Sequence, residues 1–454
     1  MKKKKYFGTD GIRGRVNEFP IIEDFFFKLA ISIKKTQKNV KKVLIGRDTR
    51  ISGKNIEKSL RDGFKKVNVD CDFIGIVSTP LISFYTKLFN YDFGIMISAS
   101  HNPYYDNGIK IFKRNGEKLS DEEELKIENN YDKVKIIPIF SATKISYKTF
   151  DVKDYTNFLV KKFKDIDLSG IKVLIDCANG SVYKLAPSFF KEIGCKVISY
   201  SCKPDGKNIN KNCGAMFPEK LSRLTKKHKV DIGLSFDGDA DRVVISDENG
   251  NVIDGDKILA IICKYKQENS IPIKSTVSTK MSNLAFRNFI KKIKVKLILS
   301  KVGDRYVIKK MKENKSYLGG EPSGHIIFSD NGYSGDGILT SIYIMNILKN
   351  SKVKLSDLSK TLYKKNYQNL VNLKTYNNPD LILKKIEIKK IKEKLLYHNK
   401  DIDLLIRKSG TENLIRIMVQ SFKKNDVDKS IKEIVNIIKK VDEQEKNHFI
   451  NCRK

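Results

Sequence analysis

The sequence predicts three related α/β units followed by a smaller α+β unit. Its 454 residues correspond to about three domains, or four, at roughly 100–200 residues per domain. Apolar strand-like runs alternate with helix-like segments through most of the chain, which favours layered α/β units with mostly parallel strands. From residue 366 onward, two closely spaced strands precede a closing amphipathic helix instead. We therefore divide the chain into 1–150, 151–254, 255–366 and 367–454.

In the first unit, short apolar runs alternate with amphipathic segments. The predicted strands are 43–45, 73–77 and 93–97, and the predicted helices are 55–66 and 79–89. The pattern restarts after a polar stretch at 140–152. The second unit has predicted strands at 172–176, 196–200, 230–236 and 243–246, a helix at 183–193 and a turn at Asn249-Gly250.

The third unit continues the same alternation. The fourth differs, because its two predicted strands are separated by a short polar loop without a crossover helix. Its expected elements are strands at 403–406 and 414–419, the polar loop 407–413 and a helix at 426–440.

The composition excludes several classes of protein. A hydrophobic share of 40% supports buried cores and argues against a disordered, collagen-like or small disulfide-bonded chain. No run approaches the ~20 apolar residues of a membrane span, and no apolar signal-peptide core follows Lys2–Lys5. The seven cysteines include no C-x-x-C pair, so neither a disulfide framework nor a zinc site is indicated. We expect a soluble cytoplasmic protein without a membrane partner.

The net charge of +35 raises the question of nucleic-acid binding. The lysines are scattered along the chain, however, without the interleaved aromatic residues of an RNA-binding surface. We interpret them as solvated faces that attract anionic substrates, and we expect no nucleic acid as the main partner. Arginines such as Arg13, Arg50 and Arg242 lie in polar loops, where their planar donor fork suits phosphate or carboxylate oxygens.

A serine follows the predicted strand 93–97. Ser100, in ISASHNP (97–103), is placed like a nucleophile at the carboxyl edge of a sheet. From these residues alone, a nucleophile and a helix cap are equally consistent interpretations. His101 beside it and Lys110 downstream add an imidazole and a cation.

Three carboxylates follow another predicted strand. Small residues separate Asp237, Asp239 and Asp241, and this spacing lets their oxygens converge on one hard cation such as Mg²⁺. A calcium-binding EF-hand is disfavoured, because Arg242 stands where that loop needs glycine and a strand follows. A solvated acidic turn is the remaining alternative, but three acids so close together in such a basic chain favour a metal site.

Two further polar loops complete the set. The loop GGEPSGH (319–325) supplies a carboxylate, a hydroxyl and an imidazole suited to sugar hydroxyls, with an ordinary glycine-rich loop as the alternative. The loop RKSGT (407–411) offers cations, hydroxyls and backbone amides for a phosphate, with an ordinary turn as the alternative. Nucleophile, cation loop, sugar loop and phosphate loop together indicate phosphoryl transfer on a phosphosugar.

With these motifs in this order, essentially the whole chain resembles the α-D-phosphohexomutases. The matching segments are KYFGTDGIRG (5–14), ISASHNPYYDNGIKIF (97–112), FDGDADR (236–242), KVGDRYV (301–307), GGEPSGH (319–325) and RKSGTENLIRIMV (407–419). The form ISASHNP with DNGIK, in place of GSHNP with NGFK, resembles the bacterial branch that acts on glucosamine phosphates. Asn413 and Gln420 depart from that branch, which usually carries proline and an acid there.

The resemblance implies four domains around a central active-site cleft, and a phosphoserine at Ser100. The implied ligands of one Mg²⁺ per subunit are Asp237, Asp239, Asp241 and an oxygen of the phosphoserine. The implied neighbours of the nucleophile, as candidates for proton transfer or charge stabilisation without a firm assignment, are Arg13, His101 and Lys110. The implied substrate-binding residues are Arg242, Glu321, Ser323, His325, Arg407, Ser409, Gly410 and Thr411.

The implied reaction interconverts α-D-glucosamine 1-phosphate and D-glucosamine 6-phosphate, which supplies UDP-N-acetylglucosamine and peptidoglycan synthesis. Glucosamine 1,6-bisphosphate would be the intermediate and activator: phosphoserine donates its phosphoryl group, the bisphosphate turns around, and Ser100 recovers the other phosphoryl group. A glucose or mannose phosphate handled by the same machinery is the alternative substrate. A homodimer is left open.

Overall fold

The computed structural model describes residues 4–164, 166–399, 401–409 and 414–451. The chain forms two compact units. The first contains Met1–Ser278 and Ile298–Leu362, and the second contains Thr279–Leu297 and Tyr363–Lys454. Among the described residues, no helix combines the length and the apolar character that a membrane crossing requires.

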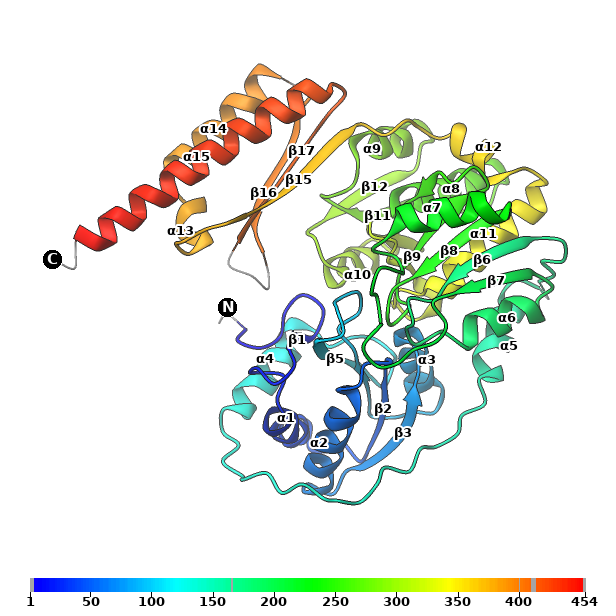
Figure 1. Cartoon of the computed structure of the whole chain (residues 1–454), viewed down its shortest axis with the longest axis vertical. Coiled ribbons are helices and arrows are strands. Elements are labelled where there is room, and N and C mark those ends of the chain that lie inside the picture. Colours follow the sequence, from blue (N-terminus) through cyan, green and yellow to red (C-terminus); the bar gives the residue numbers. More distant parts are fainter. Residues whose placement is uncertain (1–3, 165, 400, 410–413, 452–454) are drawn as a thin grey trace. The chain divides into compact units, whose positions relative to one another are not determined.

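The first sheet has the strand order β1-β5-β4-β2-β3 (Figure 1). Its strands are β1 (Ile12–Arg15), β2 (Lys42–Arg47), β3 (Asp70–Ile76), β4 (Phe93–Ile97) and β5 (Asp106–Lys113). β2 is parallel to β3 and β4, whereas β5 is antiparallel to β4 and β1. The expectation of mostly parallel strands is therefore wrong at this edge, because the loop from β4 to β5 is too short for the crossover that a parallel pair requires.

Helices cover both faces of this sheet. They are α1 (Glu23–Thr36), α2 (Gly53–Lys65), α3 (Thr79–Leu88) and α4 (Asp121–Tyr131). Ile45 of β2 belongs to the same buried cluster as Phe25 of α1 and Phe64 of α2. The next residue, Gly46, faces α3, where a Cβ would lie 2.8 Å from Ile82. Because successive strand residues point to opposite faces, the first sheet is the middle of three layers.

The second sheet, β10-β9-β8-β6-β7, repeats this plan. Its region contains α5 (Lys153–Lys162), β6 (Lys172–Asp176), α6 (Leu185–Glu192), β7 (Lys196–Tyr200), α7 (Pro218–His228), β8 (Ile232–Phe236), β9 (Val243–Asp247) and β10 (Val252–Ile253). β6 is parallel to β7 and β8, and β9 is antiparallel to β8 and β10. The predicted turn at Asn249-Gly250 connects β9 to β10.

The third sheet has the order β12-β11-β13-β14. Its region contains α8 (Gly255–Glu268), β11 (Ser275–Thr279), β12 (Lys296–Ser300), α10 (Asp304–Glu313), β13 (Leu318–Gly320), β14 (Ile326–Phe328), the 3₁₀-helix η1 (Ser329–Asn331), α11 (Gly337–Ser351) and α12 (Leu355–Lys360). β13 is parallel to β11 and antiparallel to β14. The sheets thus confirm three α/β units, while the boundaries at 150, 254 and 366 stay predictions.

The second compact unit contains a small antiparallel sheet. Its elements are α9 (Leu284–Lys292), β15 (Tyr367–Lys374), α13 (Pro379–Leu383), α14 (Ile386–His398), β16 (Asp403–Lys408), β17 (Leu414–Ser421) and α15 (Lys424–Asn451). β17 is central and antiparallel to both neighbours. Apolar residues such as Ile417 of β17 and Ile434 of α15 share one core, and α14 lies beside α15 on the same face (Figure 1). This confirms the smaller α+β unit.

Gln420, one of the two unusual residues noted in the sequence, is fully buried in this unit. Its side-chain oxygen accepts a hydrogen bond from the Leu284 N–H at 2.8 Å, and its Nε2 donates to Asp403 Oδ2 at 2.7 Å. An amide can do both, since it carries an acceptor and a donor. Asn413 lies outside the described residues.

Candidate active site

Ser100 lies in the loop between β4 and β5, with its backbone in the left-handed region at φ 53°. It is fully buried, and its Oγ donates a hydrogen bond to Asp237 Oδ2 at 2.6 Å. The same oxygen lies 3.3 Å from His101 Nδ1. The loop leads into strand β5, so the helix-cap interpretation of Ser100 is wrong. The loop instead points this hydroxyl at the predicted metal-binding residues.

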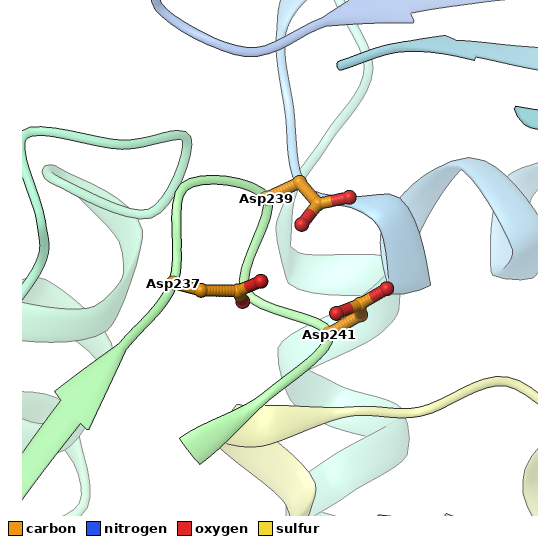
Figure 2. A group of neighbouring side chains, drawn as sticks. All are labelled: Asp237, Asp239 and Asp241. Atoms are coloured by element: carbon orange, nitrogen blue, oxygen red, sulfur yellow. The ribbon is translucent and has the colours of Figure 1, made fainter. Parts of the chain in front are cut away.

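The three aspartates occupy the tight turn between β8 and β9 (Figure 2). All are buried, and one side-chain oxygen from each lies within 4.8 Å of the others. Neighbouring elements hold the turn in place. The Thr79 N–H, at the start of α3, donates to the Asp239 carbonyl at 2.9 Å, and the Gly337 N–H, at the start of α11, donates to the Ala240 carbonyl at 3.1 Å. The turn is followed by strand β9 and not by the helix that an EF-hand would require.

The chemistry of this turn fits a hard divalent cation. Oδ1 of Asp239 is buried and accepts no hydrogen bond from any described residue, whereas Oδ1 of Asp241 lies 3.5 Å from His325 Nδ1. Burial, together with the negative charges of Asp241 and Asp239, raises the pKa of Asp237. A cation bound among the three carboxylates would relieve that repulsion, and carboxylate oxygens are the ligands that Mg²⁺ prefers. The three residues are therefore suited to holding Mg²⁺.

Lys110 of β5 reaches the same aspartates from the first sheet. Its Nζ lies 2.7 Å from Asp239 Oδ2 and 2.6 Å from Asp241 Oδ2. Burial alone would lower the pKa of Lys110, but the attraction of Asp10 and these two aspartates raises it well above its usual value. Lys110 is thus a fixed positive charge that leaves the unpartnered Oδ1 of Asp239 available.

His101 contacts Ser100, and Arg13 lies close enough to His101 for its charge to act on the imidazole. Burial, reinforced by the charges of Arg242 and Arg13, lowers the pKa of His101 to about 2. Its imidazole is therefore neutral at pH 7. Arg13 forms a short ion pair with Asp10.

The loop 319–325 packs against the aspartate turn, as the Val243 N–H donates to the Gly324 carbonyl at 3.2 Å. Glu321 Oε1 accepts a hydrogen bond from the Gly303 N–H at 3.0 Å, and burial raises the pKa of Glu321. Ser323 is exposed to solvent. The structure therefore brings the predicted sugar-binding loop to the neighbourhood of the aspartate turn.

Six largely buried side chains form a closed circuit of alternating acids and bases, which we call the charge ring. In order, they are Asp10, Lys118, Asp304, His325, Asp241 and Lys110. Apart from the shorter Lys118–Asp304 pair, neighbouring nitrogen and oxygen atoms lie between 2.5 and 3.8 Å apart. His325 therefore faces two carboxylates in this structure.

Sequence reasoning gave no role to Asp10, Asp304 or Lys118, and Lys118 is the member that lies outside every recognised motif. Burial alone would lower its pKa, but Asp10 and Asp304 attract its charge and raise the pKa instead. One lysine carries no distinguishing signal among so many, and the motifs that contain Asp10 and Asp304 do not reveal the partner of either acid. Only the packing of three segments shows that Lys118 joins Asp10 to Asp304.

The predicted phosphate-binding residues belong to the second compact unit. Arg407 lies near the end of β16, and its Nη1 donates to the Lys408 carbonyl at 3.3 Å. Ser409 is buried, and its N–H donates to the Leu414 carbonyl at 2.9 Å. Gly410 and Thr411 lie outside the described residues. The phosphate-binding role of this loop stays a prediction.

Three family models match the chain in order. They are described as Phosphoglucomutase/phosphomannomutase, alpha/beta/alpha domain I over residues 4–136, domain II over 153–250 and domain III over 254–366. The three matches include the start motif, the serine loop, the aspartate turn and the loop 319–325.

Individual proteins are similar over nearly the whole chain. The phosphoglucosamine mutase of Buchnera aphidicola subsp. Baizongia pistaciae is 42% identical over 445 residues, which cover 96% of this chain and 98% of that protein. The phosphoglucosamine mutase of Campylobacter jejuni subsp. jejuni is 40% identical over 450 residues, covering 96% and 99%. A solved phosphoglucomutase/phosphomannomutase family protein from Burkholderia thailandensis superposes with a TM-score of 0.77 at 22% identity, covering 96% of this chain and 97% of that one. This last likeness shows a shared fold.

Proposed function

The chain belongs to the phosphoglucomutase/phosphomannomutase family, and from this premise we propose how its residues carry out the phosphoglucosamine mutase reaction. The enzyme is an intramolecular phosphotransferase that interconverts D-glucosamine 6-phosphate and α-D-glucosamine 1-phosphate. The observation that carries this assignment is identity of 40% and more to phosphoglucosamine mutases over 96% of the chain. Its product feeds UDP-N-acetylglucosamine and peptidoglycan synthesis.

Ser100 is proposed as the residue that carries the phosphoryl group. Phosphoryl transfer depends mainly on positioning and charge neutralisation, so the nucleophile must be held rigidly beside positive charge. The buried Oγ, 2.6 Å from Asp237 Oδ2, supports this role. Phosphorylated Ser100 would donate to the 1-hydroxyl of glucosamine 6-phosphate, and would recover a phosphoryl group from the resulting 1,6-bisphosphate after it turns around.

Asp237, Asp239 and Asp241 are proposed to hold Mg²⁺ together with an oxygen of the phosphoserine. When bound, the ion supplies positive charge that offsets the negative charge of the transferring phosphoryl group. Two observations support this proposal: Oδ1 of Asp239 is buried without a partner, and one oxygen from each aspartate lies within 4.8 Å of the others. Lys110, ion-paired with two of the same aspartates, is suited to stabilising charge.

His101 is proposed as the partner of Ser100 in proton transfer, since its Nδ1 lies 3.3 Å from the serine Oγ. Arg13 would contribute charge stabilisation from its position beside Asp10. This division of roles follows from geometry: His101 contacts the hydroxyl, whereas Lys110 and Arg13 contact carboxylates.

The remaining roles concern the substrate. We propose that Glu321 and Ser323 bind the sugar hydroxyls in both orientations of the bisphosphate, with Arg242 and His325 completing that region. The phosphate that is not reacting would be bound by the loop of the second compact unit, through Arg407, Ser409, Gly410 and Thr411. Because the phosphate that is not reacting would be held in one place, Ser100 could exchange a phosphoryl group with either end of the sugar.

The substrate assignment is tested by comparing mutase rates with the 6-phosphates of glucosamine, glucose and mannose. Each assay contains Mg²⁺ and a trace of the corresponding 1,6-bisphosphate. We expect a preference for the amino sugar of at least about tenfold, or about 1.4 kcal/mol of transition-state discrimination. Equal rates, or a preference for glucose or mannose, would move the enzyme to the neutral-sugar alternative.

The nucleophile is tested by Ser100→Ala, with the exposed Ser169→Ala as its control. Ser100→Ala should abolish turnover and covalent phosphate incorporation while leaving the unfolding transition in place. Ser169→Ala should behave like the parent in both assays. Near-normal turnover in Ser100→Ala would overturn the assignment of the nucleophile.

A further inference from the structure

The peptide groups on both sides of Ser100 are held by side chains to which the reaction gives no role. The Ser100 N–H donates to Ser98 Oγ at 2.8 Å, and that hydroxyl donates to Asp48 Oδ2 at 2.6 Å. The Ser100 carbonyl accepts from Arg50 Nη2 and from Asn210 Nδ2, each at 2.9 Å. These bonds fix a serine whose left-handed backbone would otherwise be unfavourable.

Arg50 is completely buried beneath the serine loop. All five of its side-chain N–H groups have an acceptor. Three acceptors are backbone carbonyls of the loop, and a fourth is the carbonyl of the first residue of β5. The acceptors are Asp48 Oδ2 and the carbonyls of Ser100, Asn102, Pro103 and Asp106. A lysine, with one nitrogen, could not reach this set, so the planar fork of arginine shapes the loop.

Asn210 contacts the same loop from the region of the second sheet. It lies between β7 and α7, and its Nδ2 donates to the Ser100 carbonyl at 2.9 Å and to the Asn102 carbonyl at 3.1 Å. Arg50 Nη2 bridges the same two carbonyls at 2.9 and 2.8 Å. Asn210 is itself fixed, because its N–H donates to the Ala178 carbonyl at 2.9 Å.

The alignment of nucleophile and metal ligands depends on two different sheets. Ser100 follows a strand of the first sheet, whereas Asp237 follows a strand of the second. Phosphoryl transfer requires these loops to keep their relative position within a fraction of an ångström. Asn210 belongs to the second sheet's region and contacts the carbonyl of the nucleophile, so it bridges the two loops at the point where alignment matters.

We propose that Asn210 is a positioning residue for the mutase reaction, acting through the Ser100 carbonyl. With Arg50 it orients the nucleophile toward Asp237 without touching the substrate. This inference rests on the proposed function of Ser100. It places a determinant of turnover in the loop between β7 and α7, outside the motifs that carry the chemistry.

Asn210→Ala is compared with a matched control, Asn212→Ala. Both asparagines have left-handed backbones, at φ 56° and 53°, so alanine removes the same backbone preference at each. Asn212 is exposed. We expect Asn210→Ala to lower kcat about 10-fold to 100-fold, the effect of displacing a reacting group by up to an ångström. The KM for glucosamine 6-phosphate should stay within about twofold, and Asn212→Ala should match the parent.

Turnover is expressed per phosphorylatable Ser100, counted by mass spectrometry after incubation with the 1,6-bisphosphate. Partial unfolding would reduce the number of labelled sites but leave turnover per site unchanged, whereas misalignment lowers turnover per site. If Asn210→Ala yields no labelled protein, the isosteric Asn210→Asp decides, because it keeps the size and replaces the donor by an acceptor.

The deciding variant is Asn210→Ala, or Asn210→Asp if the alanine variant yields no labelled protein. If its turnover per site stays within about twofold of the parent, the positioning role is overturned. An equal loss in Asn212→Ala would also overturn it. Failure of the parent enzyme itself to act on glucosamine 6-phosphate would instead contradict the proposed function, so the two failures are distinguishable.

Discussion

Gly238, between the first two aspartates of the turn, packs directly against the backbone of Ser100. A Cβ at this position would lie 2.6 Å from the Ser100 carbonyl oxygen, 2.8 Å from Ile209 Cδ1 and 2.9 Å from Asn210 Nδ2. A carbon and a carbonyl oxygen in contact are about 3.3 Å apart. Gly238→Ala must therefore separate the serine loop from the aspartate turn by about 0.7 Å, the difference between that spacing and the one in the structure.

A rotamer change cannot absorb this displacement, because backbone atoms define both sides of the contact. Arg50 and Asn210 also hold the Ser100 carbonyl where it is. A shift of this size at a reacting group costs about 10-fold to 100-fold in rate, or about 1.4–2.7 kcal/mol of activation free energy. Overpacking itself should lower the free energy of unfolding by about 1–3 kcal/mol.

The matched control is Gly233→Ala, on the strand that leads into the same turn. Its Cβ would lie 2.2 Å from Thr225 Oγ1 and 2.9 Å from Leu221 Cδ1, so it is overpacked against side chains away from Ser100. Initial mutase rates and urea unfolding are measured for both variants. Gly238→Ala should lose far more activity than Gly233→Ala at a similar loss of stability. Equal activities would refute the reasoning.

Three other substitutions probe separate parts of the first unit. Asp239→Asn removes a proposed metal ligand, so the Mg²⁺ concentration for half-maximal activity should rise at least about tenfold; an unchanged Mg²⁺ titration would remove Asp239 from the site. Lys118→Met removes the buried cation that joins Asp10 to Asp304 in the charge ring, and urea unfolding should show a loss of about 3 kcal/mol. The exposed Lys133→Met should change stability by less than about 0.5 kcal/mol, and an equal effect would contradict a role for the ring. Tyr155→Phe removes the buried hydrogen bond to Asp336 Oδ2, at 2.7 Å, and should destabilise the fold by about 1.5–3 kcal/mol in the same assay, whereas no change would show that the bond contributes nothing net.

Sequence reasoning succeeded where local pattern determines structure. The predicted strands 93–97, 172–176 and 196–200 coincide with β4, β6 and β7, because each is a compact run that alternates with helical segments. β15 was missed, since most of its side chains are exposed and it carries no continuous apolar run. The antiparallel edge at β5 depends on loop length and pairing, which the apolar runs alone do not encode.

The candidate site was predictable to the extent that its residues follow strands. Ser100 and Asp237 each end an apolar run, and the structure joins them by a hydrogen bond. The contacts of Lys110 with the aspartates required the packing of two sheets. Arg50 was recognisable as an arginine in a polar loop, but its partners are backbone carbonyls, which leave no trace in the sequence.

The charge ring has a consequence for how the chain acquires its structure. Asp10, Lys110 and Lys118 come from the first sheet's region, and Asp241 comes from the second. The other two members, Asp304 and His325, come from the third. Because the members come from three regions, no single region completes the charge ring. Until it is complete, burial leaves some charges without a partner, which is costly. N-terminal domains commonly fold first during synthesis. Here the nascent chain must extend past residue 304 before Lys118 gains its second counter-charge, and past residue 325 before the charge ring is closed. Completion of the N-terminal region is therefore a late event.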